Sequence, residues 1–281
     1  MVRALSAPVP LRLRPMEIGD LLDETFRIYR RNFVLFAGIS IIVSLPQAAL
    51  SGYTSFTSLG TFSQLAAQNQ PADFGQLETT LVVLLIGILV NIALLPFIYG
   101  AVTYATCEAA QGRSVTVSAV VGTVLRKYFP LLGYFGLFIG MFVLFCLIPL
   151  WIWIWVRWVA VIPAMYVENL GLGGALSRSW QLVQGRWWRT FLVLLLMTIL
   201  TYAATAALGA FLGLAQILLG VVAAPTVFLA ISGAIQVIVE SLVDPVLLIV
   251  LVLIYFDLRV RREGLDLFQL AQRVAPPGTA L

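Results

Sequence analysis

The sequence contains no histidine and only two cysteines among its 281 residues. Histidine is the commonest general base near neutral pH and the commonest protein ligand of metal ions. The two cysteines, Cys107 and Cys146, lack metal-ligand spacing, and the topology predicted below places them at opposite faces of a membrane, which excludes a disulfide. A glycine-rich phosphate-binding loop with its lysine is also missing. We therefore expect no catalytic residues, no bound metal and no cofactor.

Charged residues are scarce as well. Only 11% of the residues are charged and 61% are hydrophobic, whereas a soluble domain is about 25% charged. So few charges cannot cover the water-facing surface of a soluble protein of this size. Several apolar stretches also reach the roughly 20 residues that cross a bilayer. The composition therefore predicts an all-α, polytopic integral membrane protein.

The net charge of +4 comes almost entirely from arginine, since Lys127 is the only lysine. The arginines cluster at the ends of the apolar segments, where basic residues set the orientation of membrane helices. We therefore interpret them as topology anchors, and we expect no binding of nucleic acid.

The apolar stretches predict six transmembrane helices, arranged as three hairpins that are each preceded by a cytoplasmic amphipathic helix. A tight hairpin near Pro149 divides the stretch 128–167, which is too long for one crossing. The last crossing ends at Phe256, and the other five are 33–52, 79–105, 128–148, 150–167 and 188–209. Apolar residues recur every three or four positions from Ile18, Val117 and Leu172, where the amphipathic helices begin.

The distribution of arginine predicts the orientation of these helices. The segments 53–78 and 210–225 contain no lysine or arginine, whereas every predicted cytoplasmic connection contains at least three. Because cytoplasmic loops are enriched in basic residues, both termini are expected in the cytoplasm. A seventh crossing within 210–235 would move the C-terminal arginines outside. We therefore interpret 210–235 as a re-entrant or surface-lying element broken at Pro225.

The chain is expected to form one domain with two tails. Residues 1–14 lack periodicity and are predicted to be a disordered cytoplasmic tail, 15–273 the six-helix membrane domain, and 274–281 a flexible tail.

The three hairpins share a pattern that suggests an internal repeat. In each, a proline in the second span is followed by an acidic residue and then by a glycine. These residues are Pro96, Glu108 and Gly112; Pro163, Glu168 and Gly171; and Pro245, Asp257 and Gly264. The pattern fits parallel repeats about an axis along the membrane normal, and the shared demands of helical hairpins would also produce it.

Three charged residues fall within predicted spans, namely Arg157, Glu240 and Asp244. Charges inside a bilayer are costly and usually functional, so these three form a candidate intramembrane charged cluster for transport of an ion or proton, or for anchoring a polar headgroup. The structural alternative is an ion pair from Arg157 to Glu240 that joins the fourth span to the sixth.

Eight arginines are expected at the interface with the inner leaflet. They are Arg30, Arg31, Arg178, Arg186, Arg189, Arg259, Arg261 and Arg262. The cytoplasmic leaflet is anionic and attracts such residues. The leading hypothesis is a non-enzymatic module that docks membrane lipids or unidentified protein partners there. The alternatives are a small transporter or lipid-handling protein that uses the intramembrane charges, and a lipid-metabolic enzyme.

Three segments of the sequence resemble a known family. They are LRPMEIGDLLD (13–23) with FRIYRRNF (26–33), ALSRSW (175–180) with GRWWR (185–189), and YFDLRVRREGLD (255–266). Together they resemble the bacterial membrane domain of glycerophosphoryl diester phosphodiesterase, over residues 14–272. The resemblance implies a stand-alone membrane module of the bacterial plasma membrane. It does not imply the enzymatic activity, because the catalytic histidine and metal-binding carboxylates of the family's soluble barrel have no counterpart in this sequence.

Overall fold

The computed structural model describes residues 15–68, 74–113, 115–141, 148–220 and 225–264, and all regular elements in these ranges are α-helices. In chain order they are α1 (Ile18–Arg31), α2 (Phe33–Gln68), α3 (Phe74–Ala110), α4 (Val117–Met141), α5 (Ile148–Arg157), α6 (Val161–Val167), α7 (Leu172–Val183), α8 (Trp187–Gly220), α9 (Pro225–Ser241) and α10 (Asp244–Glu263). The predicted tails 1–14 and 274–281 lie outside the described residues, so the predicted domain boundaries stay predictions.

Five helical stretches of the described chain are long and apolar enough to cross a membrane. They are Phe33–Tyr53, Leu81–Ala110, Ile148–Val167, Trp187–Ala215 and Ile231–Glu263. They coincide with the first, second, fourth, fifth and sixth predicted crossings. The predicted third crossing, 128–148, lies partly in α4 and partly outside the described residues. The prediction of an all-α integral membrane protein is therefore confirmed, and the third of its six crossings remains a prediction.

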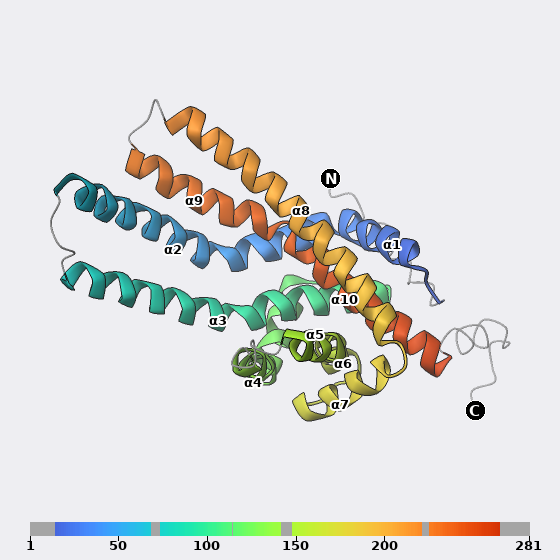
Figure 1. The fold of residues 1–281 in the computed structure, drawn as a ribbon. Coiled ribbons are helices and arrows are strands. Elements are labelled where there is room, and N and C mark those ends of the chain that lie inside the picture. The colour runs from blue at the N-terminus through green and yellow to red at the C-terminus, as the bar shows by residue number, and fades with distance from the viewer. Residues whose placement is uncertain (1–14, 69–73, 114, 142–147, 221–224, 265–281) are drawn as a thin grey trace.

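Helices α4 and α5, from the middle of the chain, run in a different direction from the long helices. In Figure 1, α2, α3, α8 and α9 run across the picture, whereas α4 and α5 are seen nearly along their axes. The second predicted hairpin, which contains α4 and α5, therefore crosses the long helices steeply instead of lying parallel to them.

The interpretation of 210–235 as a separate element needs correction. Helix α8 continues without interruption to Gly220, and α9 begins at Pro225 and packs against α8 and α2. Residues 210–220 contain no proline that would end a helix, and proline is favoured in the first turn of one. Pro225 therefore opens α9 instead of breaking an element. Within 210–235, the structure describes residues 210–220, which form the end of α8, and residues 225–235, which form the first part of α9.

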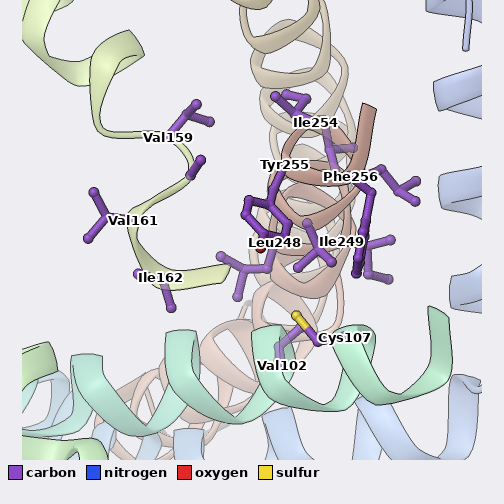
Figure 2. Close-up of a cluster of buried hydrophobic side chains, with 14 of the residues drawn as sticks. Val102, Cys107, Val159, Val161, Ile162, Leu248, Ile249, Ile254, Tyr255 and Phe256 are labelled. Atoms are coloured by element: carbon purple, nitrogen blue, oxygen red, sulfur yellow. The ribbon is translucent and has the colours of Figure 1, made fainter. Parts of the chain in front are cut away.

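Helix α10 forms the centre of the core. It is buried along most of its length and packs against α1, α3, α6, α7 and α8. Figure 2 shows Leu248, Ile249 and Tyr255 of α10 between Val102 of α3 and Ile162 of α6. Between helices in lipid, such close packing stabilises mainly through dispersion contacts. Pro245 begins the helix, and Gly264 ends it in the left-handed conformation with φ of 63°.

Large apolar side chains remain exposed on the long helices. Examples are Leu85 and Leu89 on α3 and Ile199 and Tyr202 on α8, which are 56–72% exposed. A soluble protein rarely exposes continuous apolar surface of this extent. The surface of these helices is therefore suited to lipid.

Helix α1 lies along α10. A reciprocal capping box between Glu17 and Asp20 begins α1, and its buried face consists of Leu21, Thr25 and Ile28. The apolar spacing that begins at Ile18 also includes Phe26, which is 45% exposed. The contact with α10 thus covers one side of the predicted stripe and leaves the other side open.

Candidate functional site

Charged side chains from four helices gather around the last two turns of α10. These side chains come from the end of α6, from α7, from the start of α8 and from α10 itself, and the backbone of Met16, just before α1, joins them. We call this region the polar end of the molecule. Two groups of ion pairs organise it, and each group is centred on a carboxylate.

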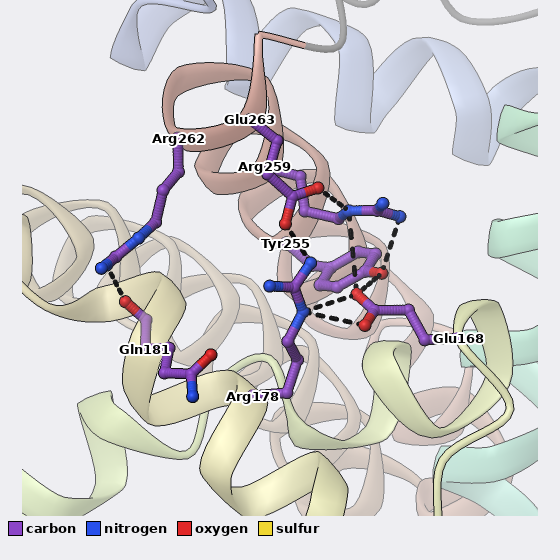
Figure 3. Close-up of polar contacts among 7 residues, drawn as sticks. All are labelled: Glu168, Arg178, Gln181, Tyr255, Arg259, Arg262 and Glu263. Carbon is purple, nitrogen blue, oxygen red and sulfur yellow. Dashed lines mark hydrogen bonds and ion pairs between the residues drawn. The ribbon is translucent and has the colours of Figure 1, made fainter.

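The first group surrounds Glu168, at the end of α6 (Figure 3). Arg178 of α7 donates from Nε to both carboxylate oxygens, at 2.8 and 2.9 Å, and Tyr255 donates its hydroxyl to Oε1 at 2.8 Å. Arg259 donates to Glu263 at 2.9 Å and lies 3.7 Å from Glu168. Arg178 also pairs with Glu263. Two guanidinium groups therefore face two carboxylates, and the Glu168 group is electrically balanced.

Hydrogen bonding keeps Arg178 charged within this group. Burial alone would lower the pKa of Arg178, but its hydrogen bonds to Glu168 and Glu263 raise the pKa above the ordinary value. Figure 3 shows the guanidinium between the two carboxylates, so Arg178 joins α7 to the end of α6 and to α10.

The second group surrounds Asp257, which is only 1% exposed. Its carboxylate accepts hydrogen bonds from Nε of Arg261 at 2.9 and 3.0 Å and from the backbone N–H of Met16 at 2.9 Å. Arg189 of α8 pairs with the same carboxylate. Arg189 and Arg261 also donate to the backbone carbonyl of Met16. Both backbone polar groups of Met16 are thereby satisfied, and the start of α1 is fixed to α8 and α10.

Two further arginines lie beside the Asp257 group. Arg186 donates from Nη2 to the backbone carbonyl of Arg261 at 3.0 Å. Arg262 donates to the carbonyl of Gln181, as Figure 3 shows, and to that of Gln184 at 3.3 Å. Gly185 adopts φ of 81° in the turn between α7 and α8, a conformation that side chains disfavour. This turn brings Arg186 back toward α10.

The structure therefore brings six of the eight predicted interface arginines together at the polar end. The six are Arg178, Arg186, Arg189, Arg259, Arg261 and Arg262. Arg30 and Arg31 lie instead on α1, where they line an open pocket with Asp23, Phe26 and Arg27.

The acidic partners of these arginines were not among the predicted site residues. These partners are Glu168, Asp257 and Glu263, and each forms an ion pair with at least one of the six arginines. A signal for two of them was present, because Glu168 and Asp257 are acids of the proline–acid–glycine pattern. The third acid of that pattern, Glu108, also pairs with an arginine, Arg113, at 3.3 Å. In each predicted repeat the acid thus holds an arginine.

Arg157 and Glu240 of the predicted intramembrane cluster have other partners in the described part of the chain. The guanidinium of Arg157 lies over the rings of Trp153 and Trp180, at 5.1 and 4.7 Å from their centroids. Glu240 accepts a hydrogen bond from Gln236 at 2.9 Å. Within the described part of the chain no ion pair joins Arg157 to Glu240. The reason is that α5 packs on α7 and α8, whereas α9, which carries Glu240, packs mainly on α2.

Glu240 and Asp244 lie on either side of a contact with α1. They flank the break between α9 and α10, and the carbonyl of Leu242 within this break accepts a hydrogen bond from the hydroxyl of Tyr29. Tyr29 belongs to the last turn of α1, next to the exposed Arg30. The hydrogen bond from Tyr29 therefore holds the break between α9 and α10 against the last turn of α1.

Comparison with protein families finds a likeness in the second half of the chain. Residues 131–263 match the model of a family described as the membrane domain of glycerophosphoryl diester phosphodiesterase. This part of the chain is similar to that family. The matched part of the membrane domain runs from α4 to the last residue of α10 and contains every residue of the Glu168 group. No curated protein and no solved structure matches the chain.

Proposed function

We propose that the protein is a non-catalytic module of the bacterial plasma membrane whose polar end docks anionic lipids of the inner leaflet. The observation that carries this proposal is the collection of arginines at the polar end beside Trp188, which is 72% exposed. Tryptophan rings favour the level of the lipid headgroups, and arginine is enriched on the cytoplasmic side. Both termini then lie in the cytoplasm.

The ion pairs support a docking role because they hold the polar end in one shape. The Glu168 group and the Asp257 group together link α1, α6, α7, α8 and α10. A surface that is already ordered loses little conformational entropy when a ligand binds. Anionic headgroups would therefore meet arginines that are already positioned.

A transporter that uses Arg157, Glu240 and Asp244 finds no corresponding support. Such a protein needs a polar cavity where the charges converge. Arg157 is instead covered by two tryptophans, and the open pocket on α1 is lined by none of the three residues. Docking of a protein partner at the same surface is the other outcome that an experiment has to distinguish.

Lipid analysis of the purified full chain tests the proposal. The protein is extracted from bacterial membranes in polymer-bounded nanodiscs, and the fraction of phosphatidylglycerol and cardiolipin in the discs is measured by mass spectrometry. We expect this fraction to exceed that of the bulk membrane. A lipid composition equal to that of the bulk membrane, together with a co-purifying protein, would assign the polar end to a protein partner instead.

An activity assay tests the non-catalytic part of the proposal. The purified chain is incubated with glycerophosphoglycerol and with glycerophosphocholine, and released glycerol 3-phosphate is quantified. We expect no release above that of a detergent blank. Release of glycerol 3-phosphate that increases with protein concentration would show that the protein is an enzyme.

A further inference from the structure

Positive charge is in excess around Asp257. Four arginines, namely Arg186, Arg189, Arg261 and Arg262, lie near this one carboxylate. The other acids of the polar end, Glu168 and Glu263, pair with Arg178 and Arg259 in the balanced Glu168 group. Among the described residues of these two groups, arginines therefore outnumber carboxylates only in the Asp257 group.

The excess is located on two of the four arginines. Arg189 and Arg261 are engaged by Asp257 and by the carbonyl of Met16. Arg186 bonds only through Nη2, and its Nη1 is shielded from solvent without an acceptor in the described ranges. Among the described residues, Arg262 donates from Nη1 to two backbone carbonyls, and its side chain is exposed. Arg186 therefore has a buried donor without an acceptor, and the neighbouring Arg262 has donors that are open to solvent.

A buried donor without a partner is rare in proteins and commonly marks the place of a water or an ion. The charge of Arg186 is also only partly compensated: burial, and after it the nearby Arg261, lower the pKa of Arg186, and Asp257, which raises it, does not offset them. Arg262 and Arg189 act in the same direction. An anion placed between Arg186 and Arg262 would supply both the acceptor and the negative charge.

The position of the two arginines indicates which anion this is. Arg186 immediately precedes Trp187 and the exposed Trp188, and tryptophan rings favour the headgroup level of a bilayer. The planar guanidinium group matches the oxygens of a phosphate. We propose that Arg186 and Arg262 bind the phosphate of an anionic phospholipid from the inner leaflet. This site rests on the proposed function, because only a polar end that faces the inner leaflet would meet a lipid phosphate in preference to a soluble anion.

A thermal-unfolding titration of the full chain in neutral detergent tests this site. The probes are short-chain phosphatidylglycerol, short-chain phosphatidylcholine and inorganic phosphate, each added to the same concentration. We expect phosphatidylglycerol to raise the melting temperature with at least tenfold higher apparent affinity than either other probe. An equal response to inorganic phosphate would overturn the lipid assignment, and an equal response to phosphatidylcholine would overturn the requirement for net negative charge.

A double variant identifies the residues. R186Q combined with R262Q should weaken the phosphatidylglycerol response at least tenfold, whereas the control R113Q, whose side chain is 64% exposed at a different ion pair, should change it less than twofold. A retained response in the double variant would refute the site. If that response persists while the wild-type nanodiscs remain enriched in anionic lipid, the site is wrong and the proposed function stands. If the wild type shows neither enrichment nor a response, both are wrong.

A crosslinking experiment on the wild type removes the dependence on a folded variant. Phosphatidylglycerol with a photoreactive headgroup is added to the full chain, and labelled peptides are identified by mass spectrometry. Label should concentrate in the peptides that contain Arg186 or Arg262. Labelling spread evenly over the arginine-containing peptides would refute the assignment.

Discussion

Neutralising the buried carboxylate of Asp257 should destabilise the protein strongly. The substitution D257N keeps the size of the side chain and an acceptor for the N–H of Met16, but it removes the negative charge that faces Arg189 and Arg261. Breaking a buried ion pair costs about 3–5 kcal/mol. The two arginine side chains are 28% and 25% exposed, so water relieves part of their charge. We therefore expect a loss near the lower limit, about 3 kcal/mol, which is about a hundredfold in the unfolding equilibrium constant.

The measurement is equilibrium unfolding of the purified chain in mixed micelles of neutral detergent and increasing SDS. The matched control is E108Q, which removes the acid of another predicted repeat but faces Arg113, an arginine that is 64% exposed. Exposed ion pairs contribute less than about 1 kcal/mol, so E108Q should unfold close to the wild type. If D257N and E108Q lower the free energy of unfolding equally, within about 0.5 kcal/mol, then burial does not strengthen the ion pairs of Asp257. That result would refute the expected loss.

Three further predictions concern topology and local structure. In a cysteine-free background, an impermeant maleimide added to intact cells should label E78C but not Q184C; labelling of Q184C alone would reverse the proposed orientation. G185A should cost about 1–2 kcal/mol in the SDS unfolding assay, because alanine disfavours φ of 81° and no neighbouring atom obstructs its Cβ; an unchanged unfolding midpoint would contradict this. Y29F removes the hydrogen bond to Leu242 and should cost about 1 kcal/mol in the same assay, and hydrogen exchange at the break between α9 and α10 should rise; unchanged exchange there would show that Tyr29 does not hold the break.

The apolar spans were predictable because length and hydropathy are local properties. Phe33–Tyr53 and Trp187–Ala215 begin where the sequence predicted them, within one residue. The course of 210–235 was not predictable in the same way. An apolar run of this kind is compatible with a surface element or with two longer helices, and only the packing of α9 against α2 and α8 decides between them.

The partners of charged residues depend on tertiary structure, which limits prediction from the sequence. The predicted pair of Arg157 with Glu240 relied on both being charges within spans. In the fold, Arg157 faces tryptophans of α5 and α7. Glu168 and Glu263 are 95 positions apart in the sequence, yet both contact Arg178. Such pairs can be suspected from a recurring acid, but their partners follow only from the arrangement of the helices.

The hydrogen bond from Met16 to Asp257 joins positions that are separated by 241 residues. During synthesis, α1 emerges from the ribosome well before α10, the helix that receives it. Helix α1 therefore cannot reach its final place until α10 has been translated and inserted. Until then its apolar face has to rest on the bilayer surface or on another protein, and a chain truncated before Asp257 would leave it there.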